Sequence, residues 1–438
     1  MTGRFWHGDP ELRAEADRLR KIADDEGTRG GAALPSRPVV QIHNGALPRV
    51  IDAAEQVLVK ADAEIFEFAD HPVYVSYEVP PKNHFAPYRR RTMFRYESAH
   101  LAEHWTRSAD FQRFDARSGK WRSIDCPEKI AIAYLQRRGR RKLRRLRGVI
   151  STPTLRPDGS ILDQAGYDEE TGLFYDPCGV EYPPLAEKPS FEDAVAALAR
   201  LREPIALFPY VPDDPADPGR SASRSVTLSA TVTGLIRASL PTVPLHSTDA
   251  TVAGSGKSLL DNIVAMVVTG RTCHPVAETE ETAEFEKRLA TALVKGPQII
   301  GLDNCTVPIG GGLLCQALTE QVISIREFGT LKGVDVENAA LILANGNNLV
   351  FKADIVRRVL RASLDPKCER PELREFSFCP LKMAAEQRPE LVIAGLTILR
   401  AYHIADRPRQ PLTPLDRSMS GRSGRERPSC GWASLIRV

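Results

Sequence analysis

The sequence predicts an α/β fold with a parallel central sheet in its second half, preceded by a mixed α+β domain. The first observation behind this prediction is residues 249–258, which read Asp-Ala-Thr-Val-Ala-Gly-Ser-Gly-Lys-Ser. The second is the apolar segment 259–268, which is typical of a helix opened by such a loop. The third is the run 298–303, which is apolar until it ends in Asp, as expected of a buried strand in a parallel sheet.

The glycine-rich loop carries the chemistry of phosphate binding. Its candidate residues are Gly254, Ser255, Gly256, Lys257 and Ser258. Glycines let backbone N–H groups turn toward phosphates, the lysine reaches the β- and γ-phosphates, and the serine hydroxyl binds Mg²⁺. Thr251 replaces the first glycine of the full pattern, and a chance match is the alternative interpretation. The loop, the helix and the acidic strand together predict a P-loop NTPase with ATP and Mg²⁺ as cofactors.

The acidic strand supplies the second half of the predicted site. Asp303 follows the loop by about 45 residues and can deliver a carboxylate to the Mg²⁺ shell. The alternative is a core strand that ends in a turn aspartate. Many ATPases place Glu after this Asp to polarise water, whereas this chain has Asn304. Either Asn304 orients water less directly, or another residue is the base, or hydrolysis is slow.

Length and composition predict a multidomain protein without a membrane segment. The chain has 438 residues, 26% charged and 42% hydrophobic, and a formal net charge of +3, so a nucleic-acid surface has to be local. Its eight cysteines are scattered without a C-x-x-C pair, which favours reduced thiols over disulfides or zinc. The apolar run at 391–399 is too short to span a membrane. We therefore expect a cytoplasmic protein.

Composition shifts divide the chain into expected segments. They are an N-terminal helix and linker (1–38, with the helix at 10–26), an α+β domain (39–211), a linker (212–224), the ATPase core (225–380), a C-terminal helix (381–405) and a disordered tail (406–438). The α+β domain is expected to contain strands at 63–68 and 72–79, a hairpin at 111–124 with its turn at Ser118-Gly119, and helices at 126–136 and 191–201.

Two further motifs have competing interpretations. The basic run 137–147 predicts contact with nucleic-acid phosphates, against a solvated surface; its candidate residues are Arg140, Arg141, Lys142, Arg144 and Arg145. The sequence His100-Leu-Ala-Glu-His104 matches a zinc-peptidase spacing. A helix face with Trp105 packed inward is the favoured interpretation of that motif.

The region 244–405 resembles the helicase-type ATPases of phage and plasmid replication proteins, in the superfamily-three branch of AAA+ proteins. The resemblance depends on the order of its motifs: the phosphate loop, Asp303-Asn304, Leu318-Thr319, the segment 325–332, the apolar run 339–344 followed by Asn345-Gly-Asn347-Asn348, the segment 354–358, the segment 371–376 and the helix 388–402. The N-terminal domain resembles those that precede the ATPase in prophage proteins, without an assigned chemistry.

The resemblance implies roles for further residues. It implies that Asn345 or Asn347 contacts the γ-phosphate and the lytic water. The alternative interpretation is an ordinary Asn-Gly turn. It also implies that Arg357 or Arg358 is an arginine finger inserted from a neighbouring subunit; a surface ion pair is the alternative interpretation. A finger in trans implies a homo-oligomer, expected to be a hexameric ring. Residues 326–338 occupy the place of a hairpin that grips single-stranded DNA. Arg326 and Lys332 are its candidate DNA contacts, and a turn lysine is the alternative for Lys332.

The C-terminal tail departs from the resemblance. Such proteins continue with a Gly-Ser-Phe-x-x-Trp-Ser segment and an apolar Ala-Leu-Val-Trp-Leu-Gly helix, whereas residues 416–438 are rich in Ser, Arg and Gly. With permissible codons, Leu415 to Gly421 read one base earlier gives Gly-Ser-Phe-Asp-Glu-Trp. Arg425 to Arg437 in that frame gives Arg-Glu-Ala-Leu-Val-Trp-Leu-Gly-Ile-Pro-Asp-Pro. This indicates a frameshift near Leu415 in a prophage-type gene, which the nucleotide sequence tests.

The resemblance and the loop together predict an ATP-dependent DNA helicase or translocase of mobile-element replication. The alternative is a nucleotide-binding scaffold that binds DNA or a partner with little or no hydrolysis, as a decayed prophage remnant would.

Overall fold

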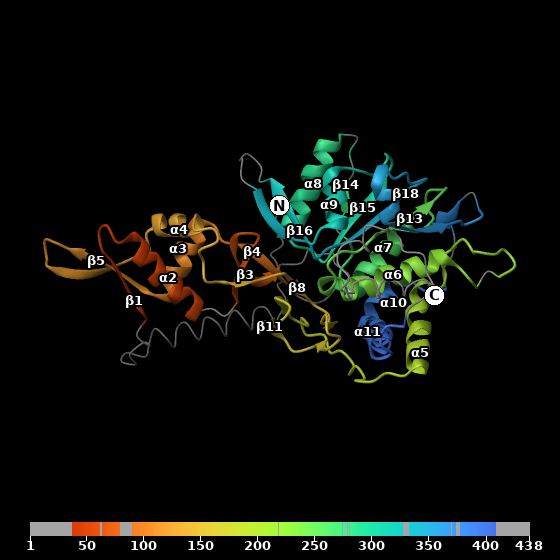
Figure 1. The fold of residues 1–438 in the computed structure, drawn as a ribbon, viewed down its shortest axis with the longest axis horizontal. Coiled ribbons are helices and arrows are strands. Elements are labelled where there is room, and N and C mark those ends of the chain that lie inside the picture. Colours follow the sequence, from red (N-terminus) through yellow and green to blue (C-terminus); the bar gives the residue numbers. More distant parts are fainter. Residues whose placement is uncertain are drawn as a thin grey trace, which may run out of the picture. The chain divides into compact units, whose positions relative to one another are not determined.

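The computed structural model describes most of the chain between residues 37 and 408. The described ranges are 37–61, 64–78, 90–217, 219–273, 275–277, 279, 281–326, 333–368, 370–373 and 377–408. The expected helix at 10–26, Lys332 and the tail from 409 onward lie outside them. The chain forms two compact units, and the described parts of the first are 37–61 and 97–136 (Figure 1). No helix in the described ranges is long and apolar enough to cross a membrane.

The described residues of the first unit (37–61 and 97–136) form a three-stranded sheet and three helices. Strand β1 (Val39–Ile42) pairs in parallel with β5 (Asp110–Asp115), which forms an antiparallel hairpin with β6 (Lys120–Ile124). Helices α2 (Leu47–Ala61), α3 (Ser98–Ser108) and α4 (Glu128–Leu135) complete the unit. The hairpin predicted at 111–124 and the helix predicted at 126–136 are both observed. Gly119 closes the hairpin turn with φ 64°, a left-handed conformation that favours glycine.

The core of the first unit is built around Trp105. Its indole is fully buried, donates a 2.9 Å hydrogen bond to the Ala54 carbonyl, and lies edge-to-face on Tyr134 at 5.3 Å. Trp105 therefore faces inward from α3, as the structural interpretation of the His100–His104 motif predicted. Glu103 pairs with Arg107 one turn along the same helix. Within the described ranges, no group of three His, Cys, Asp or Glu side chains is placed to hold a metal.

The second unit contains a five-stranded sheet in which every neighbouring pair is parallel. The strand order is β14 (Pro275–Ala277), β15 (Ile299–Cys305), β18 (Leu341–Asn347), β13 (Leu245–Ala250) and β19 (Val359–Leu364). Strand β13 leads into the glycine-rich loop and lies between β18 and β19. This arrangement agrees with the predicted α/β fold with a parallel central sheet.

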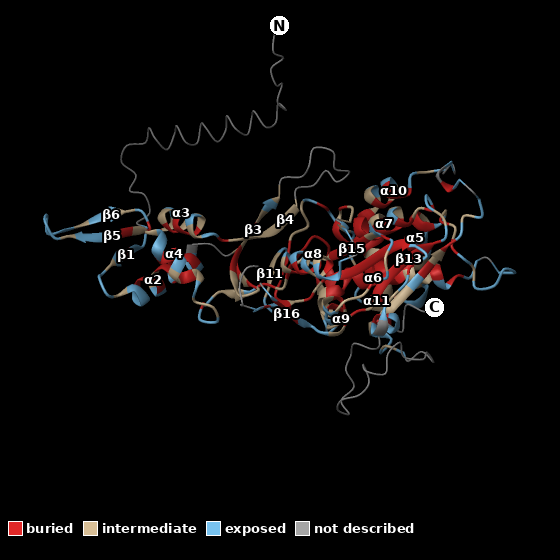
Figure 2. Ribbon diagram, turned by 90° about the horizontal axis from the view of Figure 1, so that it is seen from above, coloured by how far each residue is buried: buried red, intermediate tan, exposed pale blue. Residues whose placement is uncertain are grey.

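Helices cover both faces of this sheet because its strands are apolar on both sides. Leu341 and Leu343 of β18 pack into one core, while Ile342 and Ala344 pack into another, since successive side chains alternate. The first core includes α6 (Ala222–Leu235), α7 (Lys257–Thr269), α10 (Pro380–Glu386) and α11 (Arg388–Ile404); the second includes α8 (Thr282–Val294) and α9 (Gly312–Thr319). Figure 2 shows this buried interior in red around α6, α7 and β13.

The remaining elements of the second unit include residues that the sequence assigned to the N-terminal domain. They are the sheet β4-β3-β2-β7 (Arg90–Arg95, His71–Glu78, Ile65–Phe68, Arg144–Arg145), the sheet β11-β12-β8 (Gly166–Asp168, Leu173–Tyr175, Gly148–Ile150), the pairs β9 (Thr154–Leu155) with β10 (Ile161–Leu162) and β16 (Val322–Arg326) with β17 (Gly333–Glu337), helix α5 (Phe191–Arg202), and 3-10 turns η1 (Glu203–Ile205), η2 (Arg237–Ser239), η3 (Ala353–Arg358) and η4 (Pro371–Leu373).

The compact units divide the chain elsewhere than at the expected linker 212–224. Residues 64–96 and 137–408 share the second unit. Thr154 Oγ1 donates to the Leu235 carbonyl at 2.7 Å, and Ser151 Oγ donates to the Thr269 carbonyl at 3.2 Å. Val211 N–H donates to the Ser363 carbonyl of β19 at 3.0 Å. These bonds attach residues 151–211, which precede the expected linker, to the parallel-sheet unit. The part of the expected linker that precedes α6 is therefore a loop within that unit.

We expect the buried Arg237 to hold the connection between β17 and β18 in place. Its guanidinium donates to the carbonyls of Ala340 (2.9 Å), Leu240 (2.7 Å) and Asn338 (2.7 Å). The change Arg237→Met leaves these carbonyls without their donor and should lower the free energy of unfolding by about 3 kcal/mol. Urea denaturation measures this, with the exposed Arg220→Met as control. Equal stability of the two variants would contradict the assigned role.

Candidate phosphate-binding site

The glycine-rich loop turns directly from β13 into α7. Gly254 and Gly256 both have positive φ, 75° and 92°, and Gly256 is the N-cap of α7. A Cβ at Gly256 would also lie 3.1 Å from the Phe208 ring. Glycine is therefore required here by backbone conformation and by close approach. The loop directs the free N–H groups at the start of a 13-residue helix toward the carboxyl edge of the sheet, where an anion is favoured.

Lys257 is held in the centre of this edge. Its side chain is nearly buried, and its ammonium group donates to Asn347 Oδ1 at 2.7 Å and to the Val252 carbonyl at 3.4 Å. Burial lowers the pKa of Lys257, while the carboxylates of Asp249 and Asp303 act in the opposite direction. The structure thus brings together two residues that the sequence singled out 90 positions apart.

Ser258 and Asp303 meet beside the lysine. Ser258 Oγ donates to Asp303 Oδ1 at 2.8 Å and lies 3.5 Å from Asn345 Oδ1. A hydroxyl and a carboxylate are the hard oxygen ligands that Mg²⁺ prefers, and one or two protein ligands are its usual share in phosphate sites. The donor set therefore fits that ion.

Asn345 connects this pair to a buried carboxylate that sequence reasoning missed. Asn345 Oδ1 accepts the Asn304 N–H at 3.1 Å, and its Nδ2 donates to Asp261 Oδ2 at 2.8 Å. Asp261 also accepts from Thr248 Oγ1 at 3.3 Å. Burial raises the pKa of Asp261 to about 7, the nearby Asp303 charge adds to this, and the two hydrogen bonds oppose it. The available signal was an acidic residue inside the apolar stretch 259–268.

Asp249 is a second residue that the sequence did not single out. It accepts the Leu349 N–H at 2.9 Å through Oδ1 and pairs with Arg361 of β19 through Oδ2. The Asn348 N–H donates to the Ala250 carbonyl at 3.1 Å. These contacts attach the turn that follows β18 to the end of β13, next to the phosphate loop.

Asn304 occupies an exposed position at a bulge in β15. Its φ is 53°, a left-handed value that asparagine tolerates better than most residues, and the strand register shifts between Leu302 and Cys305. The backbone N–H of Asn304 faces Asn345, as described above.

The two candidate finger arginines differ in their surroundings. Both lie at the end of η3. Arg358 donates to the Asp354 carbonyl at 3.1 Å and lies 3.5 Å from Cys315 Sγ. Arg357 is exposed. Of the two, Arg357 has the more accessible guanidinium.

The basic run 137–147 is not one continuous basic surface. The Arg141 side chain is 0% exposed and pairs with Glu67 at 3.3 Å, so the prediction that it contacts nucleic acid is wrong, because its charge is used inside the protein. Arg144 lies 4.5 Å from the Tyr167 ring centroid and 3.4 Å from Glu169. Arg140, Lys142 and Arg145 are exposed.

The segment predicted as a DNA-gripping hairpin does form an antiparallel pair. Strands β16 and β17 pair from Val322 opposite Glu337 to Arg326 opposite Gly333. Arg326 is exposed at the end of this ladder. The base of the hairpin is attached to the basic run through Arg147, whose Nε donates to Glu337 Oε2 at 2.7 Å.

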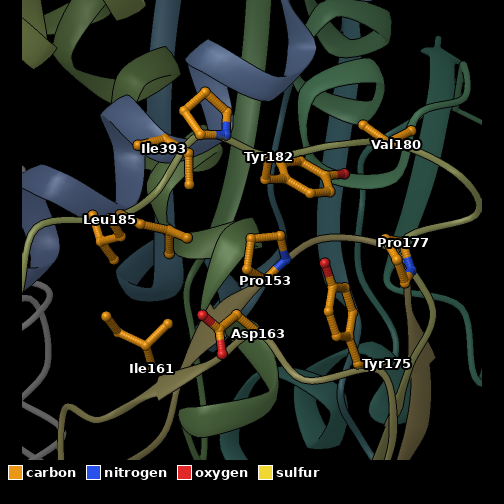
Figure 3. Close-up of a pocket in the computed structure, with 11 residues that line it drawn as sticks. Pro153, Ile161, Asp163, Tyr175, Pro177, Val180, Tyr182, Leu185 and Ile393 are labelled. Carbon is orange, nitrogen blue, oxygen red and sulfur yellow. The ribbon is translucent and has the colours of Figure 1, made fainter.

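A separate cavity of about 210 Å³ lies between the segment 153–185 and helix α11. Figure 3 shows Tyr175, Tyr182 and prolines around it, with Asp163 at its side. None of its lining residues belongs to the phosphate loop or to β15 and β18.

Comparison with known proteins gives no family assignment. No protein-family profile matches the chain, and no curated protein matches it. Among solved structures, the chain is similar to two apo A-form structures of the NrS-1 C-terminal region. The first has 10% identity and a TM-score of 0.31, covering 80% of this chain and 68% of that one. The second has 10% identity and a TM-score of 0.33, covering 78% and 67%. It is also similar to a JCV helicase bound to a substituted acetamide, with 13% identity, a TM-score of 0.23, and 48% and 60% covered. These TM-scores are all below 0.5.

Proposed function

We propose that this protein is an ATP- and Mg²⁺-dependent ATPase of the DNA helicase or translocase type, acting in the replication of a mobile element. The observation that carries the proposal is the meeting of Lys257, Ser258 and Asp303 at the carboxyl edge of a parallel sheet, directly after a glycine loop. Ligands of open α/β sheets bind at this edge.

Each residue of the site has a task that its geometry suits. The loop N–H groups and Lys257 bind the phosphates, and Ser258 and Asp303 hold the metal. Mg²⁺ supplies positive charge against the negative charge that develops on the transferred phosphoryl group. Asp261, Asn304 and Ser258 hold the Asn345 side-chain amide in one orientation. In this proposal that amide lies beside the γ-phosphate of bound ATP.

We assign the finger role to Arg357, which would reach the site of a neighbouring subunit in a hexameric ring. The variants Lys257→Ala and Arg357→Ala should each lose hydrolysis, by on the order of 10³-fold for the arginine. Mixing the two should restore part of the activity, since a mixed interface combines an intact loop with an intact arginine. Steady-state hydrolysis measures this. Two inactive proteins that remain inactive when mixed, while still co-assembling by light scattering, would contradict a finger in trans.

DNA contacts in this proposal come from exposed cations only. These are Arg326 at the end of β16 and the exposed part of the basic run, namely Arg140, Lys142 and Arg145. Such contacts neutralise backbone phosphates without reading sequence.

A nucleotide-binding scaffold with little hydrolysis is the second candidate. Asn304 stands where a water-polarising carboxylate is common, and its exposed amide cannot act as a base. In this case ATP binds and DNA or a partner is held without turnover.

Strand separation tests the first candidate against the second. A forked duplex with a labelled strand is incubated with the protein, ATP and Mg²⁺, and release of the strand is followed. The helicase proposal predicts release that stops when EDTA removes Mg²⁺ or when a non-hydrolysable analogue replaces ATP. ATP binding without hydrolysis and without release favours the scaffold.

A further inference from the structure

The β5–β6 hairpin of the first unit presents aromatic rings at its surface. Phe114 of β5 lies directly opposite Trp121 of β6, and their ring centroids are 5.6 Å apart. His43, which follows β1, places its ring 5.0 Å from Trp121. Phe114 is 50% exposed, although phenylalanine is usually buried. The three rings form a contiguous aromatic cluster on the sheet.

The hairpin that carries this cluster is rich in basic side chains, although Asp110 and Asp125 flank it. Residues 111–124 contain four basic side chains and one acidic side chain, and the four basic residues, Arg113, Arg117, Lys120 and Arg122, are all exposed. The acidic residue, Asp115, accepts from Arg122 Nε at 3.0 Å, from Ser118 Oγ at 2.8 Å and from the Arg117 N–H at 3.0 Å. Within the described part of the chain, Arg113, Arg117 and Lys120 have no ion-pair partner.

The hairpin is also accessible within its own unit. In both views its strands extend beyond helices α2, α3 and α4, and Figure 2 colours most of the extended part as exposed. Hydrogen bonds between β5 and β6 run from Phe111 opposite Ile124 to Asp115 opposite Lys120, so the ladder fixes the rings and the cations relative to one another. Because successive side chains of a strand point to opposite faces, Phe114 and Trp121 lie on one face of the hairpin, and Arg113, Lys120 and Arg122 lie on the other, with Arg117 in the turn. We name the two faces of this exposed two-stranded ladder together the hairpin surface (His43, Arg113, Phe114, Arg117, Lys120, Trp121 and Arg122).

We propose that the hairpin surface binds single-stranded DNA, with unpaired bases stacking on Phe114 and Trp121 and the backbone attracted by the exposed basic side chains of the turn and of the opposite face of the hairpin. Bases have π-faces that stack on aromatic side chains in any sequence, and basic side chains neutralise phosphates. In duplex DNA the base faces are already stacked, so exposed rings favour the single-stranded form. The choice of DNA rests on the proposed function; the surface itself belongs to a different compact unit from the phosphate loop.

Binding of a labelled oligothymidylate to the full-length chain, without nucleotide, tests this proposal by fluorescence anisotropy. The double variant Phe114→Ala/Trp121→Ala should bind about tenfold or more weakly, given the loss of two stacking rings. Phe114→Tyr keeps a ring and should retain affinity. Ile132→Ala is the matched control, because Ile132 is a 48% exposed apolar side chain on α4 of the same unit. The variant Arg113→Gln/Lys120→Gln should reduce the slope of log affinity against log salt by about 1.4, because each phosphate contact to a single strand contributes about 0.7.

Three results would overturn the proposal. One is equal affinity of the ring variant and Ile132→Ala. Another is an equal loss of affinity for a duplex of the same length, which would show that the rings do not act by stacking on unpaired bases. The third is a change in oligomeric state of the ring variant with unchanged DNA affinity, which would assign the surface to a protein partner.

The test is independent of the phosphate site. In a Lys257→Ala background the ring variant should still weaken DNA binding by the same factor. If the wild type does not bind ATP but the ring variant still binds DNA more weakly than the wild type, the proposed function is wrong. DNA binding by the hairpin surface is then still supported.

Discussion

Lys257→Ala should abolish most ATP binding. Lys257 is held at the carboxyl edge of the sheet with its ammonium group 2.7 Å from Asn347 Oδ1, and 8% of the residue is exposed. A charge-assisted contact to phosphate in such a dry position is among the stronger polar interactions, so we expect affinity to fall by about a hundredfold. Titration with a fluorescent ATP analogue in the presence of Mg²⁺ measures this.

The control for this prediction is Lys382→Ala. Lys382 is a 66% exposed residue on α10 that pairs with Glu386 one turn away. It should bind nucleotide as the wild type does. Thermal unfolding of both variants separates loss of the site from loss of the fold. Unchanged affinity in a folded Lys257→Ala protein would mean that the loop is a chance match.

Asp261→Ala should reduce turnover more than it reduces ATP affinity. The Lys257 ammonium group bonds Val252 and Asn347, whereas the Asp261 carboxylate accepts from Asn345 Nδ2 at 2.8 Å and so directs the opposite end of that amide, Oδ1, toward Ser258 and Asn304. Without the carboxylate, the Asn345 amide is held only through Oδ1, and we expect kcat to fall by about tenfold to a hundredfold with a smaller change in KM. Asp261→Asn keeps an acceptor for Asn345 and should recover most of the loss. Equal damage from Ala and Asn would contradict this positioning role.

The pH dependence of stability provides a second readout for Asp261. Burial raises its pKa from the ordinary 3.8 to about 7, so between these values the folded state holds a proton that the unfolded state has released. The free energy of unfolding therefore falls as pH rises from about 4 to about 7, by a few kcal/mol, and levels off above. The difference between wild type and Asp261→Asn, measured without nucleotide and Mg²⁺, isolates this effect.

Subtracting the free energy of unfolding of Asp261→Asn from that of the wild type also removes an opposing, pH-dependent contribution from His246. Burial lowers the pKa of His246 to about 4, so its contribution to stability is lost as pH falls from about 6.5 toward 4. Both proteins contain His246, so its contribution to the free energy of unfolding cancels in the difference. A difference that does not change with pH would contradict the raised pKa of Asp261.

The parts of the site that were predictable are those encoded by neighbouring residues. The loop, α7 and the apolar strands β15 and β18 follow from local spacing and from periodicity, and the structure places them as expected at one edge of a parallel sheet. Asp261 was not predictable, because its role depends on Asn345, which lies 84 residues later in the sequence.

Charge and domain boundaries were less predictable for the same reason. The density of the basic run does not distinguish Arg141 from its neighbours, since its partner Glu67 lies 74 residues earlier. The composition of 212–224 suggests a linker, but Val211 N–H donates to the Ser363 carbonyl (3.0 Å) and Ser223 Oγ accepts from the Ser363 N–H (2.9 Å), so both ends of this segment are attached to β19. Local composition contains no information on such long-range bonds.

Steady-state ATP hydrolysis with and without single-stranded DNA, compared between wild type and Lys257→Ala, is the decisive test of ATPase activity at the phosphate loop. The proposed motor predicts Mg²⁺-dependent hydrolysis by the wild type that rises when DNA is added and is lost in the variant. Nucleotide binding by the wild type without hydrolysis, whether or not DNA is present, would contradict the motor and leave a nucleotide-binding scaffold.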